Sequence, residues 1–314
     1  MTADASNSRL IRAMPAVFVL IWSTGFIVAK FGLPFAPPLR FLTLRYGLSI
    51  LCFLVWIALA RAPWPKGPRQ WLHLAVTGLL MHAGYLGGVW MAVKAGMGSG
   101  LAALIVGLQP VLTALWVSQV GDGGSQPSSA ANRVSPRQWL GLGLGFGGLL
   151  LVVSRKFGSG QPIQEVTALT LGCTVVALLC ITAGTLYQKR YVQSGDVRTA
   201  NAIQLAAAFA VTLPLSFFEA EPIVWNPSFL GAMAWSVLAL TLGGSSLLYL
   251  LIQRGAATAV TSLLYLVPPT TALMAWLLFD EPITLATVVG TAVTAVGVSL
   301  VVRAAKPARD HGAV

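Results

Sequence analysis

The sequence predicts an all-α membrane protein with ten transmembrane helices, arranged as two inverted repeats of five helices. Only 9% of the 314 residues are charged, compared with about 25% in an average soluble domain, and the mean hydropathy is +0.78. Apolar stretches recur at the length of about 20 residues that a helix needs to cross the hydrocarbon of a bilayer. Related motifs also return in the second half of the chain.

This composition excludes a soluble enzyme, a disordered protein and a small secreted domain held by disulfides. The three cysteines, Cys52, Cys173 and Cys180, all lie in apolar stretches, so a role in helix packing is expected rather than a disulfide framework or a zinc site. We expect no metal and no cofactor. The net charge of +11 comes from basic residues in short loops between apolar runs, a pattern that reports membrane topology and not a nucleic-acid partner.

Charged, proline and glycine clusters divide the chain into the ten predicted spans. They cover residues 13–32, 40–60, 70–93, 97–119, 136–153, 166–189, 200–218, 228–252, 256–279 and 283–302. With a cytoplasmic N-terminus, 14 of the 20 Lys and Arg residues fall on the inside and five on the outside, with Arg45 inside a span. This bias predicts that both termini are cytoplasmic. The apolar stretch that begins after Arg12 has no cleavage site of small residues and is expected to remain as the first span.

The two halves of the chain resemble each other in three places. Gly25 and Lys30 of the first span match Gly184 and Lys189 of the sixth, both at one common offset. LQPVLTAL (108–115) matches LVPPTTAL (266–273), and WLGLGLGFGGLLLVV (139–153) matches VVGTAVTAVGVSLVV (288–302). The predicted organisation is a tail at 1–12, a first repeat at 13–153 with a polar loop at 120–135, a second repeat at 154–302, and a tail at 303–314.

Five spans per repeat is an odd number, so the second repeat must enter the membrane from the opposite side. Inverted repeats of this kind are typical of secondary transporters, whose substrate site lies near the midplane where the repeats meet. The repeat therefore indicates a transporter through its architecture and without any catalytic motif.

Several segments together resemble the EamA family of the drug/metabolite transporter superfamily. They are the opening IWSTGFIVAKFGL, the arginine in the second span, the proline-centred fourth and ninth spans, and FDEPIT before the last span. The resemblance covers about residues 15–302 as two units. It implies a ten-helix carrier of the inner membrane, often an exporter of amino acids or related metabolites, that works by alternating access.

Arg45 is the first candidate substrate-binding residue. It lies about six residues, or roughly 9 Å, into the second span, where a charge is costly and marks a substrate pathway or a buried partner. Its guanidinium suits a bidentate pair with a substrate carboxylate. Capping of helix carbonyls and snorkelling to the headgroups are the alternatives. Gln204 occupies the matching position in the second repeat, so the predicted site is asymmetric.

His82 lies near the centre of the third span and shares a helix face with Tyr85 three residues later. A histidine at this depth can take a proton or bond a polar ligand, although it can also simply bond another helix. We expect His82 to line a cavity. No Asp or Glu lies deep in any span, so the carboxylate relay common in proton-driven carriers has no obvious members.

Aromatic residues with polar tips complete the predicted cavity. Trp22, Tyr249 and Tyr265 lie deep within spans, where their N–H or O–H groups need a partner that lipid does not supply. Helix packing is an equal alternative for each. Lys30 and Lys189 end matched spans, where a snorkelling anchor is favoured over a charge that selects anions.

Prolines and glycines have a mechanical interpretation. Pro110 and Pro268 remove backbone donors and are expected to kink the fourth and ninth spans, which would let the repeats move. The small-residue spacings formed by Gly141, Gly143, Gly145 and Gly147 permit close helix approach. The resemblance to the EamA family implies that the last helix of each unit packs against its partner, so we interpret these spacings as packing between the repeats.

The predicted function is export of a small polar or zwitterionic metabolite, such as an amino acid, across the inner membrane. A membrane-embedded enzyme is disfavoured because Gly98-Ser99-Gly100 has neither a deep orienting acid nor paired catalytic groups. A channel is disfavoured because the spans lack polar rings. The expected partners are a small-molecule substrate and the lipid bilayer, with a monomer rather than an obligate oligomer and no nucleic acid.

Overall fold

The computed structural model describes residues 2–120, 136–158, 166–193, 195–247, 266–281 and 283–304. Within these ranges the chain is helical and contains no β-strand. The first half contains α1 (Thr2–Gly32), α2 (Pro38–Ala60), α3 (Pro68–Gly78), η1 (Leu79–Gly84), α4 (Tyr85–Lys94), α5 (Ser99–Val106), α6 (Gln109–Val120) and α7 (Pro136–Gly158). The second contains α8 (Ala168–Tyr191), α9 (Val197–Ser216), α10 (Pro227–Trp235), η2 (Ser236–Gly244), α13 (Val267–Phe279) and α14 (Leu285–Ala304).

The described helices overlap the predicted spans, with two kinds of departure, and residues 248–265 of the predicted eighth and ninth spans lie outside the described residues. The third and eighth spans each contain a π-helical segment, η1 and η2, between or after α-helical turns. The fourth span is interrupted at Gly107 and Leu108, and α6 restarts with Pro110 in its first turn. A proline is tolerated in the first turn because no donor is needed there, so this span is broken just before Pro110.

Five helical segments are long and apolar enough to cross a membrane. They are Pro38–Ala60, Pro68–Lys94, Ala168–Tyr191, Val197–Ser216 and Pro227–Leu247. Five shorter apolar helices accompany them, at Val17–Gly32, Ser99–Thr113, Trp139–Val152, Val267–Phe279 and Leu285–Leu300. The described residues therefore form an all-helical membrane protein.

Local sequence signals explain where several helices begin. Proline occupies the first turn of α2, α3 and α10, where its fixed φ favours a helix and its missing N–H costs nothing. Thr167 and Thr170 form a capping box at the start of α8. The side chains of Asp196 and Asn226 accept hydrogen bonds from the first backbone N–H groups of α9 and α10.

The start of α2 has no side-chain cap of its own, and a remote acid takes that place. The Glu219 carboxylate accepts hydrogen bonds from the backbone N–H groups of Leu39 and Arg40 at 2.9 and 2.8 Å. The Arg40 guanidinium in turn donates to the backbone carbonyls of Ser216, Glu219 and Glu221. A negative charge at a helix N-terminus is favourable. The segment after α9 thus fixes α2, the helix that carries Arg45.

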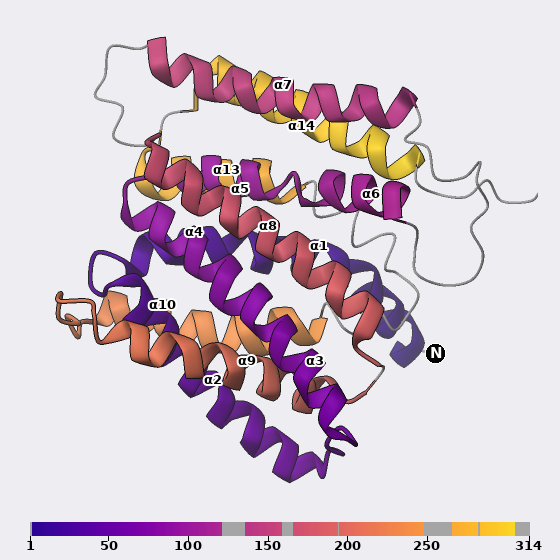
Figure 1. Ribbon diagram of the computed structural model, residues 1–314, viewed down its shortest axis with the longest axis vertical. Coiled ribbons are helices and arrows are strands. Elements are labelled where there is room, and N and C mark those ends of the chain that lie inside the picture. Colours follow the sequence, from indigo (N-terminus) through magenta and orange to yellow (C-terminus); the bar gives the residue numbers. More distant parts are fainter. Residues whose placement is uncertain are drawn as a thin grey trace, which may run out of the picture.

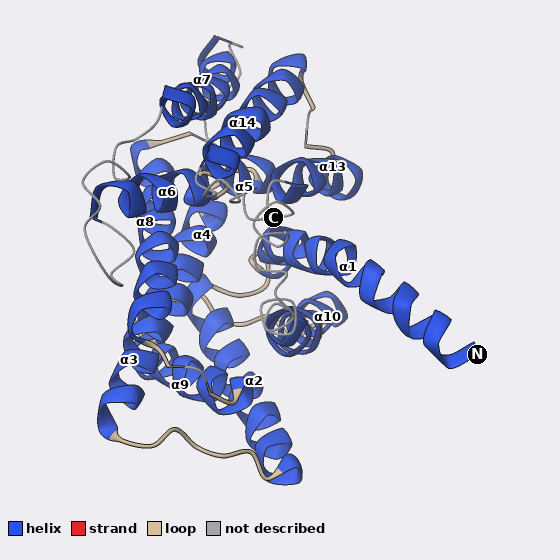
Figure 2. Ribbon diagram, turned by 90° about the vertical axis from the view of Figure 1, so that its right-hand side faces the viewer, coloured by secondary structure: helices blue, strands red, loops and turns tan. Residues whose placement is uncertain are grey.

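The helices form a bundle with a separate pair along one side (Figure 1). The pair consists of α7 and α14, which lie side by side along their length. The remaining helices pack around α4 and α8, and α2 lies along α9 at the opposite side of the bundle. Figure 2 shows that the N-terminal part of α1 projects away from the other helices.

Glycines bring α7 and α14 into direct backbone contact. A Cβ added at Gly148 would clash with the Gly290 carbonyl oxygen, and one at Gly297 would lie 2.5 Å from the Gly141 carbonyl oxygen. Thr294 also donates a hydrogen bond to the Gly145 carbonyl, at 3.2 Å. In contrast, a Cβ added at Gly143 or Gly147 would meet no atom within 4 Å. The predicted packing role therefore fits Gly141 and Gly145 but is wrong for Gly143 and Gly147, which face away.

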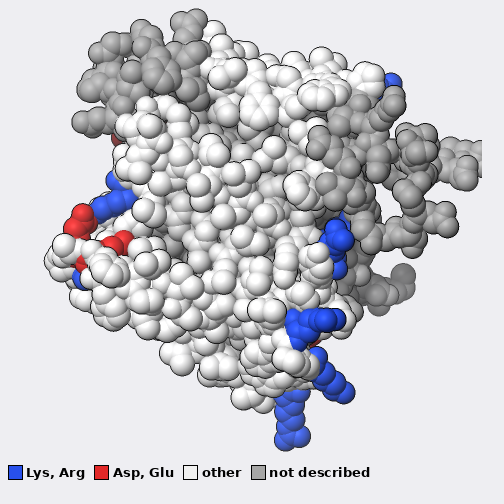
Figure 3. All heavy atoms as spheres, viewed as in Figure 1, with Lys and Arg blue, Asp and Glu red and all other residues white. Residues whose placement is uncertain are grey.

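The surface carries its charges at two opposite ends (Figure 3). One edge of the visible face has acidic and basic side chains together, the other has mainly Lys and Arg, and uncharged atoms fill the area between. Large apolar side chains are strongly exposed, among them Leu59 (81%) and Leu285 (79%). Water would oppose such exposure, whereas lipid accepts it.

The end with mixed charges is held by ion pairs between distant segments. Lys30 Nζ lies 2.7 Å from Oε1 of Glu281, and Lys94 Nζ lies 2.5 Å from Oε2 of Glu221. Glu281 also accepts a hydrogen bond from the backbone N–H of Ser99. Lys30 was expected to be a snorkelling anchor, but the structure joins it to an acid 251 residues away.

Candidate functional site

Two π-helical segments flank the centre of the bundle. Segments η1 and η2 are π-helical, so their backbone hydrogen bonds span five residues instead of the four of an α-helix, and such segments are often found at functional sites. Segment η1 contains His82, and η2 contains Thr241. Each segment belongs to a different half of the chain.

Neighbouring residues of α2 bind these two segments. Arg45 donates a hydrogen bond from Nε to Oγ1 of Thr241 at 3.1 Å, and Thr241 directs its own hydroxyl to the Ser236 carbonyl at 2.8 Å. The next residue, Tyr46, donates its hydroxyl to the His82 backbone carbonyl at 2.8 Å. Consecutive residues on a helix point about 100° apart, so α2 reaches η2 with one side chain and η1 with the next.

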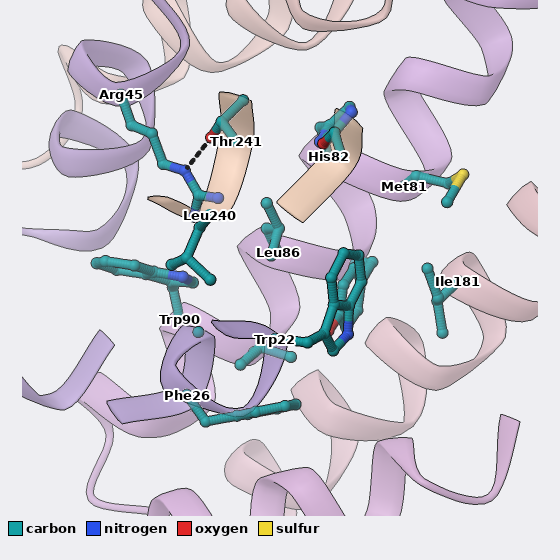
Figure 4. Close-up of a pocket in the computed structure, with 14 residues that line it drawn as sticks. Trp22, Phe26, Arg45, Met81, His82, Leu86, Trp90, Ile181, Leu240 and Thr241 are labelled. Atoms are coloured by element: carbon teal, nitrogen blue, oxygen red, sulfur yellow. Dashed lines mark hydrogen bonds between the residues drawn. The ribbon is translucent and has the colours of Figure 1, made fainter. Parts of the chain in front are cut away.

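A cavity lies between α1, α2, η1, α4, α8 and η2, and residues from all six elements line it. Figure 4 shows side chains from these helices facing the same space, with Arg45 bonded to Thr241 on one side. The apolar part of the wall includes Phe26, Leu86, Val89, Trp90, Ile181 and Leu240.

Four of the predicted site residues meet at this cavity. Trp22, Arg45, His82 and Tyr85 all line it. Gln204 is absent from the lining, but its side chain lies within hydrogen-bonding reach of the His82 ring. The predicted positions Tyr249 and Tyr265 lie outside the described residues.

The two predicted kink prolines lie away from this cavity. Pro110 is in the first turn of α6, next to the break in the fourth span. Pro268 is buried in the first turn of α13 and contributes to a second, smaller cavity with Leu104, Gly107 and residues of α14. A Cβ added at Gly107 would lie 2.8 Å from Cγ of Pro268. The break in one span is therefore packed against the proline of the other.

Arg45 brings a charge into the cavity that no acid balances within the described lining. Its residue surface is 7% exposed, and the partner of its Nε is the neutral hydroxyl of Thr241. None of the described lining residues is Asp or Glu. A buried charge without a counter-charge is costly, so this cavity is suited to a ligand that carries a negative group.

The structure adds lining residues that the sequence prediction did not name as site residues. Thr241, Ser245 and Met81 line the cavity. A usable signal was present, because Thr241 follows His82 at the same offset by which Gly184 of the sixth span follows Gly25 of the first. Applying this offset to His82 would have identified Thr241.

Comparison with known families gives a match over most of the chain. The model of the EamA-like transporter family matches residues 13–120 and 168–303. These two ranges include every described residue that lines the larger cavity.

Curated relatives are named as transporters. A protein of Archaeoglobus fulgidus called an uncharacterized transporter is 24% identical over 91% of this chain and 94% of its own length. The uncharacterized inner membrane transporter YedA of Escherichia coli K12 is 27% identical over 74% of this chain and 71% of its own length. A probable amino-acid metabolite efflux pump of Salmonella typhimurium is 23% identical over 62% and 59%, respectively.

A solved crystal structure shares the fold. It superimposes with a TM-score of 0.61 over 91% of this chain and 94% of its own chain, at 17% sequence identity. This likeness concerns the fold alone.

Proposed function

The chain belongs to the EamA-like transporter family, and from this membership we propose that it is a secondary transporter that exports small metabolites related to amino acids. The substrate occupies the cavity beside Arg45 and crosses the membrane by alternating access. The observation that carries the proposal is the cavity whose described lining contains the buried guanidinium of Arg45 and no acid.

The position of this cavity supports an inverted repeat. At the offset that separates Gly25 from Gly184, the residue pairs Trp22 and Ile181, Met81 and Leu240, His82 and Thr241, and Leu86 and Ser245 all line it. Segments η1 and η2 also fall at corresponding positions of the third and eighth spans. A cavity lined by matched residues from both halves is what a pseudo-two-fold axis through its centre produces.

Contacts between the two halves also follow the repeat, because a contact between two residues recurs between the residues that match them in the other half. Arg45 contacts Thr241, and their matched residues, Gln204 and His82, also contact each other. Gly148 meets Gly290 and Gly141 meets Gly297, as expected if Gly141 matches Gly290 and Gly148 matches Gly297. These exchanged contacts support two five-span units at 13–153 and 154–302, with ten spans in total.

In the proposed site, Arg45 binds an anionic group of the substrate through its guanidinium. His82 and Tyr85 offer neutral polar groups, while Trp22 covers the apolar part of the substrate. Tyr249 and Tyr265 remain predicted lining residues, and Gln204 orients the His82 ring from outside the lining. Pro110 and Pro268 are proposed to lie where the fourth and ninth spans bend during the transport cycle.

We propose that the protein lies in the inner membrane with both termini in the cytoplasm. The printed name of YedA supports the membrane, and the charge distribution supports the orientation. At the proposed outer end, Lys30 and Lys94 each pair with a glutamate. At the proposed inner end, exposed basic residues are numerous, including Arg61, Lys66 and Arg69.

The name of the Salmonella relative, an amino-acid metabolite efflux pump, supports the substrate class and the direction. No observation favours the alternatives of an embedded enzyme or a channel. Ser99, the candidate nucleophile, donates its hydroxyl to the Phe26 carbonyl at 3.1 Å and serves helix packing. Because the cavity forms within a single chain, a monomer is the proposed working unit.

Transport into proteoliposomes tests this function. Purified protein is reconstituted and offered a panel of radiolabelled amino acids, sugars and nucleosides and the carboxylic acids derived from the amino acids. We expect saturable uptake of at least one carboxylated solute, its loss in Arg45→Gln, and its retention in Arg69→Gln, because Arg69 is exposed on α3. Uptake no faster than in protein-free liposomes for every solute would contradict the proposal.

A further inference from the structure

The hydrogen bonds of the Arg45 guanidinium narrow the class of substrate that this cavity can bind. Nε donates to Thr241, whereas the two terminal nitrogens make no hydrogen bond to any residue in the described ranges. Arg45 nevertheless lines the cavity. Among the described residues, these two nitrogens are therefore available to donate a pair of hydrogen bonds to one carboxylate.

The described acidic residues that could pair with the ammonium group of a substrate lie away from the cavity. Four of the described acids are engaged near the ends of helices, with Glu281 at Lys30, Glu221 at Lys94, Glu219 at the start of α2, and Asp196 at Arg198. Asp280 is exposed after α13. The remaining acids of the sequence, Asp4, Asp122, Glu165 and Asp310, all lie outside the predicted spans.

The rest of the wall is suited to an apolar body. Phe26, Trp90 and Val89 are buried and line the cavity together with Leu86, Ile181 and Leu240. The wall also carries the polar side chains of Thr241, Ser245, His82 and Tyr85. None of the described lining residues is an acid, so none of these side chains has a carboxylate beside it within that lining. The described wall therefore offers hydrogen bonds to a substrate but no negative charge for an ammonium group.

We propose that this cavity selects monocarboxylates that have an apolar body and carry no ammonium group, such as the carbon skeletons left when an apolar amino acid loses its nitrogen. The inference rests on the proposed function, since it names the substrate class of that same cavity. It departs from the zwitterionic amino acid that the sequence alone favours.

The physical reason is the balance of charge. A monocarboxylate neutralises Arg45, so the loaded cavity carries no net charge. A zwitterion brings an ammonium group within about two bonds of its carboxylate, and that group loses its hydration without gaining an anionic partner. It also lies close to the guanidinium, which repels it. Cation–π contact with the faces of Trp22 and Trp90 can offset part of this cost, but it does not replace an anionic partner.

Three ligands with the same benzyl body test the inference. They are 3-phenylpropanoate with the carboxylate alone, L-phenylalanine with both charges, and 2-phenylethylamine with the ammonium alone. Binding to the purified full chain is measured by calorimetry in detergent at neutral pH. Binding is preferred to flux here because protonated carboxylic acids cross bilayers unaided. The pair of 4-methylpentanoate and L-leucine repeats the comparison with an aliphatic body.

We expect 3-phenylpropanoate to bind at least about 10-fold more tightly than L-phenylalanine, and 2-phenylethylamine not to bind. Arg45→Gln should abolish the preference, and Arg69→Gln should leave it unchanged. Equal or tighter binding of L-phenylalanine would overturn the inference, while its dependence on Arg45 would still support the proposed site. If none of the ligands binds, the inference also fails, and the proteoliposome panel then decides the proposed function separately.

Discussion

Arg45 and Thr241 lie 196 residues apart in sequence and are joined by a hydrogen bond of 3.1 Å in the centre of the bundle. Thr241 can accept this bond because its own proton goes to the Ser236 carbonyl, five residues earlier in η2. A widened helical turn of one half of the chain thus orients the cation of the other half. The first two predictions concern this pair.

Replacing Arg45 with Lys should separate substrate pairing from membrane anchoring. Lysine keeps the charge but loses the planar fork, so affinity for a carboxylated solute should fall about 10-fold or more, as for the loss of one charge-assisted hydrogen bond. The protein should remain folded in detergent. Arg45→Gln should lose at least as much. Unchanged carboxylate affinity in both variants, measured by calorimetry, would remove Arg45 from the site.

Replacing Thr241 with Val should weaken binding without removing any charge. Valine has nearly the same shape but cannot accept from Nε of Arg45, so the guanidinium loses its orientation. We expect a loss of affinity of about 3- to 10-fold and a decrease of roughly 1–2 kcal/mol in the free energy of unfolding. Thr212→Val is the matched control, because Thr212 is buried and bonds only its own helix, at the Phe209 carbonyl. Equal effects of the two variants on binding would argue against a positioning role.

Gly148→Ala should destabilise the contact between α7 and α14. The added Cβ would clash with the Gly290 carbonyl oxygen and lie 2.5 Å from Oγ1 of Thr294, so the helices must separate. A loss of about 1–3 kcal/mol is expected from such overpacking, which a lower Tm in detergent would reveal. Gly147→Ala is the control on the same helix. Its Cβ meets no atom within 4 Å, and alanine favours a helix by about 1 kcal/mol over glycine, so its Tm should be unchanged or higher.

The membrane topology can be mapped with reporter fusions. Fusions at residues about 125 and 195 should report the cytoplasm, and fusions at about 160 and 222 the periplasm. With a cytoplasmic N-terminus, the first two positions follow four and six predicted spans, whereas the other two follow five and seven. The placement of Glu221 beside Lys94 and Arg40 agrees with an outer end near residue 222. Opposite locations for 125 and 195 would end the inverted-repeat interpretation.

Transport should continue when the proton gradient is removed. The described cavity contains no carboxylate that could carry a proton, so facilitated export or exchange is expected. The measurement is uptake into proteoliposomes with and without an imposed pH gradient, each corrected for protein-free liposomes under the same gradient. Accumulation that depends on the gradient and on the protein would contradict this prediction. Loss of that accumulation in His82→Ala would then identify His82 as the proton carrier.

Much of the fold could be predicted because it depends on local composition. Hydropathy locates the helices, since a helix in lipid needs a continuous apolar stretch. Helix periodicity also explains which glycines meet at the α7–α14 interface. Gly141, Gly145 and Gly148 recur at four and three residues and share a face, whereas Gly143 and Gly147 point elsewhere. Counting this period would have corrected the prediction before the structure was known.

The site was predicted only in part. Arg45, His82, Tyr85 and Trp22 were identified because polar groups deep in apolar spans require a partner, and all four line one cavity. The π-helical segments could not be predicted, because η1 and η2 lie within apolar runs that are also compatible with an α-helix. Lys30 was assigned to the membrane surface, since a sequence does not show that Glu281 will lie 2.7 Å away.

The sequence by itself therefore determined the class of protein and the approximate position of the described helices, since both depend on the order of apolar and charged residues along the chain. It also predicts the inverted repeat. Only the tertiary structure decided which polar groups meet. Arg45 reaches Thr241, and Tyr46 reaches the His82 carbonyl, because packing brings α2 against both π-helical segments. The tertiary structure also placed the described acids beside cations and helix ends outside the cavity. That separation of charge, which depends on contacts between distant segments, leaves no acid beside Arg45 among the described lining residues, as the proposed anion site requires.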